Sequence, residues 1–311
     1  MGANLQISPV DTGTGIQVYD HARAQMIEER VLGDRLLRFA YLSPARPLCS
    51  LLLFRTALLS RFLGWYCDTA RSRCKIVPTI RELGLDESEF RDPTSSFRTF
   101  NEFFTRHLRS GARPFDASPE ILSSPADARL TVFPDLREGT CVPVKGAAFT
   151  VSELLRDASG DASQFVGGTL LVLRLCPADY HRFHYPASGR VLRRWEISGR
   201  LHSVNPLVLA LGIPVFTQNR RIVTLLDLER FGVTAFVEVG AFGVAGIVQT
   251  HTGREFRKMD EKGLFRFGGS TVILVFRRGR VLMDPDLVER SRTGIETLVR
   301  VGEQLGRVGS I

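Results

Sequence analysis

Acid–base chemistry is suggested by PADYHRFHYPASG, residues 177–189, which holds two of the six histidines, His181 and His184. The segment follows the apolar run 169–175 and is bracketed by prolines, so we expect a loop at a strand end, where functional side chains are commonly displayed. Imidazole titrates near neutrality, which suits proton transfer, although a structural histidine pair fits the same pattern. A metal site is disfavoured, because beyond Asp179 few ligand-type residues accompany the pair.

A second candidate is Asp127, in the stretch LSSPADARL at residues 122–130. A Pro-Ala-Asp turn that leads into a strand presents its carboxylate at a fixed angle. Such a carboxylate could orient an imidazole, as the acid of a Ser-His-Asp arrangement does. Alone the signal is weak, because aspartate is common in turns for purely structural reasons.

The third candidate is Ser270 in FRFGGSTVILVF, where Gly268 and Gly269 precede the serine and the apolar run 272–276 follows. A serine that attacks an external substrate usually lies in a GxSxG elbow between a strand and a helix. Here a strand follows, so that interpretation fits poorly. Either the glycines permit an ordinary tight bend, or Ser270 attacks the preceding carbonyl, which glycine leaves unhindered.

Taken together, these pieces resemble one family, the phosphatidylserine decarboxylases, which are pyruvoyl enzymes. The resemblance covers almost the whole chain, and the GGST form of the cleavage motif, rather than LGST, is similar to one branch of the family. Nine blocks occur in the same order: FNEFFTRHLRSGARPFD (100–116), SPADARL (124–130), VPVKGAAFTVSELL (142–155), DYHRFHYPASG (179–189), LHSVNP (201–206), FTQNRR (216–221), FVEVGA (236–241), EKGLFRFGGSTVILVF (261–276) and IETLVRVGEQLG (295–306).

The resemblance implies a role for each candidate residue. Ser270 matches the self-cleavage serine, so the scissile bond is Gly269–Ser270. Asp127 and His184 match the other members of the triad that activates this serine. His181 matches the histidine that assists decarboxylation through proton transfer, and the division of roles is less firmly implied than the pair itself.

The implied chemistry produces the cofactor from the chain. Ser270 Oγ attacks the Gly269 carbonyl, elimination releases chain 1–269, and Ser270 becomes a covalent pyruvoyl group on chain 270–311. This group accepts the electron pair left by departing CO₂ and converts phosphatidylserine to phosphatidylethanolamine, with no metal needed. Strand pairing keeps the two fragments associated, and homodimerisation is a family expectation.

Three departures from the family pattern stand near these motifs. Ala128 stands where the family commonly has glycine, so a backbone conformation with positive φ is less favourable at this position. Met259 and Asp260 in KMDEKG replace residues of the usual KGEEKG, and VGAFGVAGIV at 239–248 is an unusual small-residue stretch. None of these replaces any of the four candidate residues.

The elements that must position these residues suggest an α+β fold. The pattern predicts helices between residues 20 and 110, at 21–42, 48–67, 79–85 and 96–108. After Pro114, short apolar runs separated by glycine and proline predict a mostly antiparallel β domain, with one helix at 150–157. We therefore expect an N-terminal helical, membrane-associating region at 1–113 and a β-rich catalytic domain at 114–311, whose tail is either a helix or irregular.

Charge distribution points to a membrane surface. The 311-residue chain carries a formal charge of +8, and nine Lys/Arg stand against two Asp/Glu between Arg30 and Lys75. The apolar stretch 48–67 is interrupted by Arg55 and Arg61, which disfavours a spanning helix and favours one lying in the interface of an anionic membrane. A basic-faced helix packed on the protein is the alternative, and a nucleic-acid partner is disfavoured because aromatic and basic residues do not interleave.

Cellular location follows from weaker signals. Five cysteines without a CxxC pair, and a beginning without a signal-peptide pattern, favour reduced thiols. We therefore expect a peripheral protein at the cytoplasmic face of the cell membrane. Three rival functions stay open: a pyruvoyl decarboxylase of a soluble amino acid, a serine hydrolase using Ser270, His184 and Asp127, and a non-catalytic membrane-binding protein.

Overall fold

A computed structural model describes most of the chain. The described residues are 16–29, 58–136, 142–144, 147–156, 161–204, 206–210, 212–241, 246–268 and 270–309. Most of the predicted basic segment, including residues 30–57, lies outside them, as do Gly269 and residues 242–245 of the unusual small-residue stretch.

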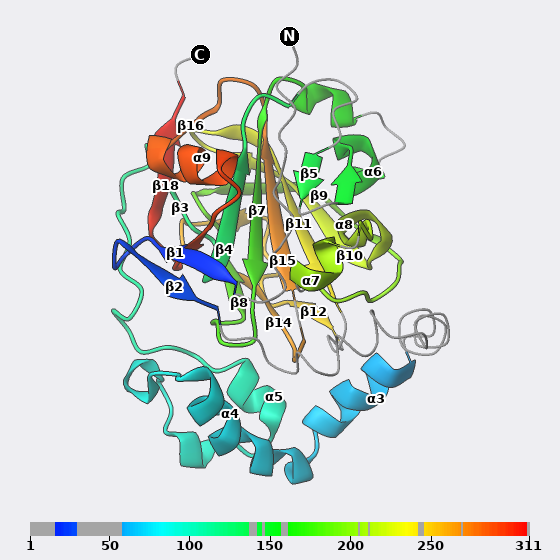
Figure 1. The fold of residues 1–311 in the computed structure, drawn as a ribbon. Coiled ribbons are helices and arrows are strands. Elements are labelled where there is room, and N and C mark those ends of the chain that lie inside the picture. Colours follow the sequence, from blue (N-terminus) through cyan, green and yellow to red (C-terminus); the bar gives the residue numbers. More distant parts are fainter. Residues whose placement is uncertain are drawn as a thin grey trace.

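A ten-stranded sheet forms the centre of the protein (Figure 1). Neighbouring strands run antiparallel except for the parallel pair of β1 and β17, so the predicted antiparallel β fold is confirmed. In order across the sheet, the strands are β13 (Glu255–Phe256), β9 (Gly189–Ile197), β10 (Arg221–Leu228), β11 (Gly232–Gly240), β15 (Ser270–Phe276), β7 (Thr169–Leu175), β4 (Ala128–Phe133), β17 (Glu296–Val299), β1 (Gln17–Asp20) and β2 (Gln25–Glu28).

The central strands are buried on both faces, which explains their unbroken apolar sequences. β7 and β15 alternate their side chains between two hydrophobic clusters, one on each face. Helices α6 (Val151–Leu155), α7 (Pro206–Ala210) and α8 (Val215–Gln218) contribute to the first cluster. Helix α9 (Pro285–Arg292) and two small sheets contribute to the second.

The small sheets account for the remaining strands. One contains β12 (Ile247–Gln249), β14 (Glu261–Phe265) and β8 (Arg182–His184). A second contains β16 (Val281–Met283), β18 (Gln304–Val308) and β3 (Ile121–Ser123), and β5 (Val142–Val144) pairs with β6 (Ala147–Phe149). The predicted helix at 150–157 is confirmed as α6, which begins with a capping box between Thr150 and Glu153. The tail contains both a helix, α9, and the strands β17 and β18.

The helix predicted at 21–42 is wrong for its described part. Residues 17–28 instead form the hairpin of β1 and β2, at the edge of the main sheet. Val18 is fully buried, and Asp20 is held by Arg300 at 3.1 Å between Oδ2 and Nη2. Because β1 pairs with β17 from the far end of the chain, local apolar spacing could not reveal this strand.

Other N-terminal helices do form, and they pack at one end of the sheet, near β8, β12 and β14 (Figure 1). They are α3 (Leu58–Cys67), α4 (Ile76–Leu83) and α5 (Phe100–Phe104), with short 3₁₀ turns at Ala70–Lys75, Glu87–Glu89 and Thr94–Ser96. Buried aromatic residues on and around α5 form their core. Among the described helices, none has the length and apolar character needed to cross a membrane.

Candidate active site

Ser270 is the first residue of β15, where it pairs with Leu175 on β7 and Gly240 on β11. Side chains alternate along a strand, so Ser270 shares a face with Val272, whose side chain belongs to the same cluster as Phe183 of β8. The serine is fully buried, and Oγ has no hydrogen-bond partner among the described residues. Its hydroxyl therefore lies on the face that the sheet of β8, β12 and β14 covers.

His181 immediately precedes β8 and is fully buried. Its Nδ1 lies 2.9 Å from the carbonyl oxygen of Asp179, so Nδ1 carries the proton and Nε2 keeps a lone pair, without a partner in the described structure. The Phe104 ring lies against it, with 3.8 Å between ring centroids. Burial, and then the charge of Arg106, lower the pKa of His181 to about 3, so the ring is neutral.

His184 is the last residue of β8, and its two ring nitrogens have environments like those of His181. Its Nδ1 lies 3.0 Å from the Met259 carbonyl oxygen, and Nε2 is buried without a partner among the described residues. Its backbone N–H donates to the Pro125 carbonyl at 2.8 Å, which brings the histidine segment beside the Pro-Ala-Asp turn. Burial lowers the pKa of His184, against smaller opposing effects of the Met259 carbonyl, Glu261 and Asp127.

Asp127 lies close to this histidine but is bonded elsewhere. Its two carboxylate oxygens accept three hydrogen bonds of 2.7 to 3.1 Å from Arg113, and Oδ1 also accepts one of 2.8 Å from the Val301 N–H. The carboxylate therefore acts on His184 through its charge rather than by a direct hydrogen bond. Ala128, which follows, begins β4 with no positive φ, so the strain expected there is absent.

The segment before Ser270 is attached to the N-terminal helices. The Phe267 N–H donates to Asn101 Oδ1 at 2.8 Å, and the Phe267 ring packs edge-on against Phe100 and Phe104 at 5.0 and 5.2 Å between centroids. Gly268 follows with φ 141°, a backbone conformation that residues with a Cβ atom rarely adopt. Helix α5 thus holds the chain next to the predicted cleavage bond.

Three contributing residues were not singled out as site residues by sequence reasoning. Arg113 and Asn101 both lie in the block 100–116, so their membership of a family block was the available signal. Met259 was noticed only as a departure from the family pattern. The structure gives its carbonyl a contact with His184 and its backbone a left-handed φ of 66°, which suits the glycine it replaces.

Buried charged residues hold the loop that carries His181 in place. Asp179 accepts a hydrogen bond of 2.7 Å from the Cys176 N–H and a short ion-pair contact from Arg129. Burial lowers the pKa of Arg129, but the carboxylates of Asp179 and Glu29 raise it more, so the guanidinium stays charged. This pairing holds the carbonyl that orients His181.

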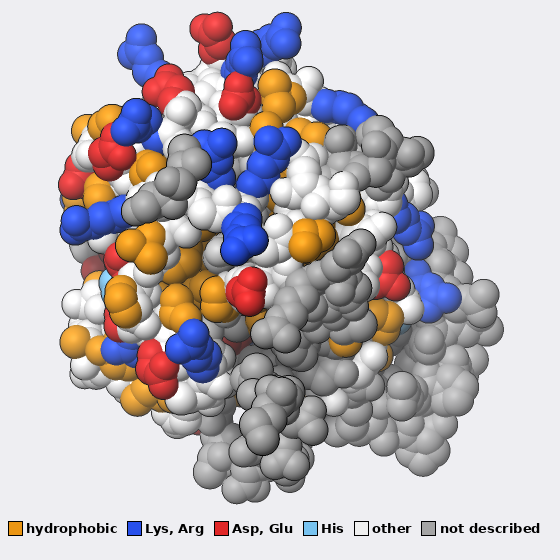
Figure 2. Space-filling view, turned by 90° about the horizontal axis from the view of Figure 1, so that it is seen from above, with side chains coloured by type: hydrophobic (Ala, Val, Ile, Leu, Met, Phe, Trp, Pro, Cys, Tyr) orange, Lys and Arg blue, Asp and Glu red, His pale blue; other side chains and the backbone are white. Residues whose placement is uncertain are grey.

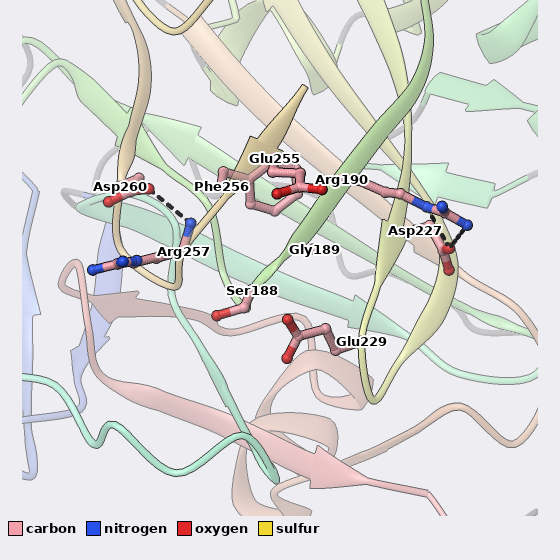
Figure 3. A pocket seen from close by; sticks show the side chains of 9 residues that line it. All are labelled: Ser188, Gly189, Arg190, Asp227, Glu229, Glu255, Phe256, Arg257 and Asp260. Atoms are coloured by element: carbon pink, nitrogen blue, oxygen red, sulfur yellow. Dashed lines mark hydrogen bonds and ion pairs between the residues drawn. The ribbon is translucent and has the colours of Figure 1, made fainter. Parts of the chain in front are cut away.

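A separate pocket of about 560 Å³ lies beside the turn that contains Met259 (Figure 3). It is lined mostly by charged side chains from β9, β10, β13 and neighbouring turns, and in one of these turns the Arg257 backbone N–H donates to Asp260 Oδ2 at 2.7 Å. None of the predicted site residues lines it. Over the described part of the chain, no group of three His, Cys, Asp or Glu side chains is arranged to hold a metal ion.

The comparison with known proteins agrees with this arrangement. The family model described as phosphatidylserine decarboxylase matches residues 100–307. The chain belongs to the phosphatidylserine decarboxylase family. It is 38% identical to the phosphatidylserine decarboxylase proenzymes of Ruminiclostridium cellulolyticum and Clostridium beijerinckii, over 94% of this chain and 97% and 98% of theirs. It is 35% identical to that of Fusobacterium nucleatum, over 94% of this chain and 97% of the relative. The predicted family membership is confirmed.

Proposed function

We propose that this protein is a self-processing, pyruvoyl-dependent decarboxylase that converts phosphatidylserine to phosphatidylethanolamine. One observation carries the proposal: Ser270 Oγ is buried on the face covered by β8, the strand that ends at His184 and directly follows His181. Among the described residues, neither Oγ nor the Nε2 atoms of these two neutral histidines have a hydrogen-bond partner. The names of the relatives, which are phosphatidylserine decarboxylase proenzymes, support both the substrate and the self-processing.

We assign the base in self-cleavage to His184. The Met259 carbonyl fixes the proton on Nδ1, which leaves Nε2 to accept the Ser270 hydroxyl proton. Oγ then adds to the Gly269 carbonyl carbon, the peptide C–N bond breaks, and the amine takes the proton, which leaves an ester. The charge of Asp127 stabilises the transient imidazolium from a distance.

Elimination completes the cleavage. Loss of the Ser270 α-proton expels the Gly269 carboxylate, and hydrolysis then releases ammonia and leaves a pyruvoyl group at residue 270. The buried, apolar surroundings of Ser270 fit a small uncharged group of this kind. When formed, it would supply the electron sink for decarboxylation.

We assign proton transfer during decarboxylation to His181. Its Nε2, buried without a partner among the described residues, would relay a proton to the substrate carbon that has lost CO₂. The low pKa makes this ring a strong donor once it is protonated. The Phe104 ring and the Asp179 carbonyl hold the imidazole in position.

The place of β15 in the sheet supports continued association of the two fragments. This strand lies between β11 and β7, with seven residues paired to each neighbour, so cleavage at its first residue leaves the ladder intact. The fragment 270–311 also contributes α9, β17 and β18 to the fold.

Membrane association is supported by the surface of the helical end. On α3, Phe62 and Trp65 are 58% and 62% exposed, and Val77 on α4 is 45% exposed. Exposed basic residues Arg71, Arg73 and Lys75 lie between them in sequence. The face seen from above in Figure 2 mixes basic, acidic and apolar side chains. We infer that the helical end rests on an anionic membrane at its cytoplasmic face.

Intact-mass measurement and a lipid assay test the proposal together. The wild type should give two chains divided between residues 269 and 270, with a pyruvoyl group on the smaller one, and should release CO₂ from phosphatidylserine vesicles. Ser270→Ala should remain whole and inactive. A whole wild-type chain with esterase activity favours the serine hydrolase, whereas equal turnover of free serine favours a soluble substrate.

A further inference from the structure

Arg106 has an unusual environment for a buried arginine. It follows α5, is 5% exposed, and lies over the rings of Phe90 and Phe103, with 4.7 and 5.2 Å from the guanidinium carbon to the ring centroids. Within the described structure, Nε and Nη1 meet no hydrogen-bond acceptor. Nη2 makes one long contact of 3.5 Å with the Ala178 carbonyl.

Two other arginines near the site, the half-buried Arg113 and the buried Arg174, are paired directly. Arg113 binds Asp127 through Nη2 at 2.7 Å, and Arg174 binds Glu296 through Nη2 at 2.7 Å. Arg106 has no such ion pair with any described carboxylate, and burial lowers its pKa to about 10. A buried guanidinium with free donors is costly, because it has given up hydration without receiving partners in return. Such a group is suited to receive an anion.

The position of Arg106 relates this anion to the reaction. Ala178, its contact, lies three residues before His181 on the same loop, and the charge of Arg106 contributes to the low pKa of His181. Phe103 and Phe104 are adjacent on α5, with one ring under Arg106 and the other on His181. Arg106 and His181 therefore lie against neighbouring rings of α5, and the Phe104 ring also packs on Phe267, three residues before Ser270.

We propose that Arg106 binds the phosphodiester of the phospholipid headgroup while the serine amine and carboxylate reach the reacting centre. This inference rests on the proposed function. A guanidinium matches the fork of phosphate oxygens. The substrate carboxylate is the poorer candidate, because a cation that stabilises it would oppose its departure as neutral CO₂.

The test compares two lipids in detergent micelles. One is phosphatidylserine, and the other is an ether lipid in which serine is joined directly to diacylglycerol, so that only the phosphate is missing. For fully self-cleaved Arg106→Gln, we expect kcat/KM on phosphatidylserine to fall about 10- to 100-fold, mainly through KM, with little change on the ether lipid. Arg106→Lys should retain part of the preference.

Arg109→Gln is the matched control. Arg109 lies in the same segment as Arg106 but is exposed, and its Nε donates to the Phe90 carbonyl oxygen at 3.0 Å. This variant should leave kcat/KM on both lipids unchanged. Equal losses on both lipids in Arg106→Gln would overturn the inference, because the carboxylate and any structural role are common to both. So would failure of every Arg106 variant to fold or self-cleave. A wild type that decarboxylates neither lipid contradicts the proposed function itself.

Discussion

The side-chain oxygen of Asn101 accepts a hydrogen bond of 2.8 Å from the backbone N–H of Phe267, two residues before the predicted cleavage carbonyl. The other end of the same amide donates to Asp68 Oδ1 at 2.9 Å, just after α3. One buried side chain thus connects the end of α3, α5 and the segment that must present Gly269 to Ser270. Self-cleavage requires the scissile carbonyl to be held in place, so this connection has a kinetic consequence.

Asn101→Ala should slow self-cleavage about tenfold, because one hydrogen bond that positions the cleavage segment is lost. The cleaved fraction can be followed by gel after cell-free synthesis. Thr99→Ala is the control, since Thr99 caps α5 through Glu102 N–H at 3.2 Å but does not contact Phe267. If both variants slow cleavage equally, Asn101 acts through helix stability alone.

Met259→Gly should stabilise the folded protein by roughly 1 kcal/mol. Met259 has φ 66°, where a side chain is strained and glycine is not, although glycine gains more entropy on unfolding. Its contact with His184 uses the backbone carbonyl and is preserved. Urea unfolding in a Ser270→Ala background measures the change, and Met259→Ala, which keeps a Cβ, should show no gain. A glycine variant less stable than the parent contradicts the strain argument.

His181 should make stability depend on pH. Its pKa falls from an ordinary 6.5 to about 3 on folding, so between these values the unfolded chain binds a proton that the folded chain does not. The folded state therefore keeps its full stability with respect to His181 above pH 6.5, and it loses stability as the pH falls toward 3. In the Ser270→Ala background, unfolding free energy should drop between pH 7 and 4 by roughly 3 kcal/mol more than in His181→Asn. Parallel pH profiles would show that His181 is protonated in the folded state.

The sequence predicted the central strands well because each is a short apolar run, buried on both faces, whose boundaries glycine and proline mark. For example, the apolar run from Thr271 to Phe276 predicts β15 to within one residue. The hairpin of β1 and β2 escaped prediction, since its strand character comes from pairing with β17 rather than from its own composition. Local patterns cannot carry information about a partner at the other end of the chain.

The candidate site shows the same division. Side-chain types and family blocks pointed to His181, His184 and Ser270, and the structure brings the histidine segment onto the face that holds the serine hydroxyl. The groups that orient them could not be predicted, because two are backbone carbonyls, of Asp179 and Met259. A carbonyl has no sequence signature, and its direction depends on the tertiary fold.

A buried ion pair joins the small sheet to the main one, between Lys262 on β14 and Glu238 on β11. Both side chains are fully buried, and Lys262 Nζ also donates to Thr224 Oγ1 at 3.1 Å and Gln249 Oε1 at 2.9 Å. Burial lowers the pKa of Lys262, while Glu238 opposes this effect. The Glu238 carboxylate therefore offsets part of the cost of burying the Lys262 ammonium group.

Lys262→Met should destabilise the protein by about 3 to 5 kcal/mol in urea unfolding, because it leaves the Glu238 carboxylate buried without a cation. Adding Glu238→Gln should recover at least half of that loss, since the amide removes the charge and can still bond Gln249. Strict additivity of the two single changes would contradict direct coupling. Because Lys262 lies on β14, which pairs with the strand that carries His184, the single variant should also cleave more slowly, and the double variant should regain speed together with stability.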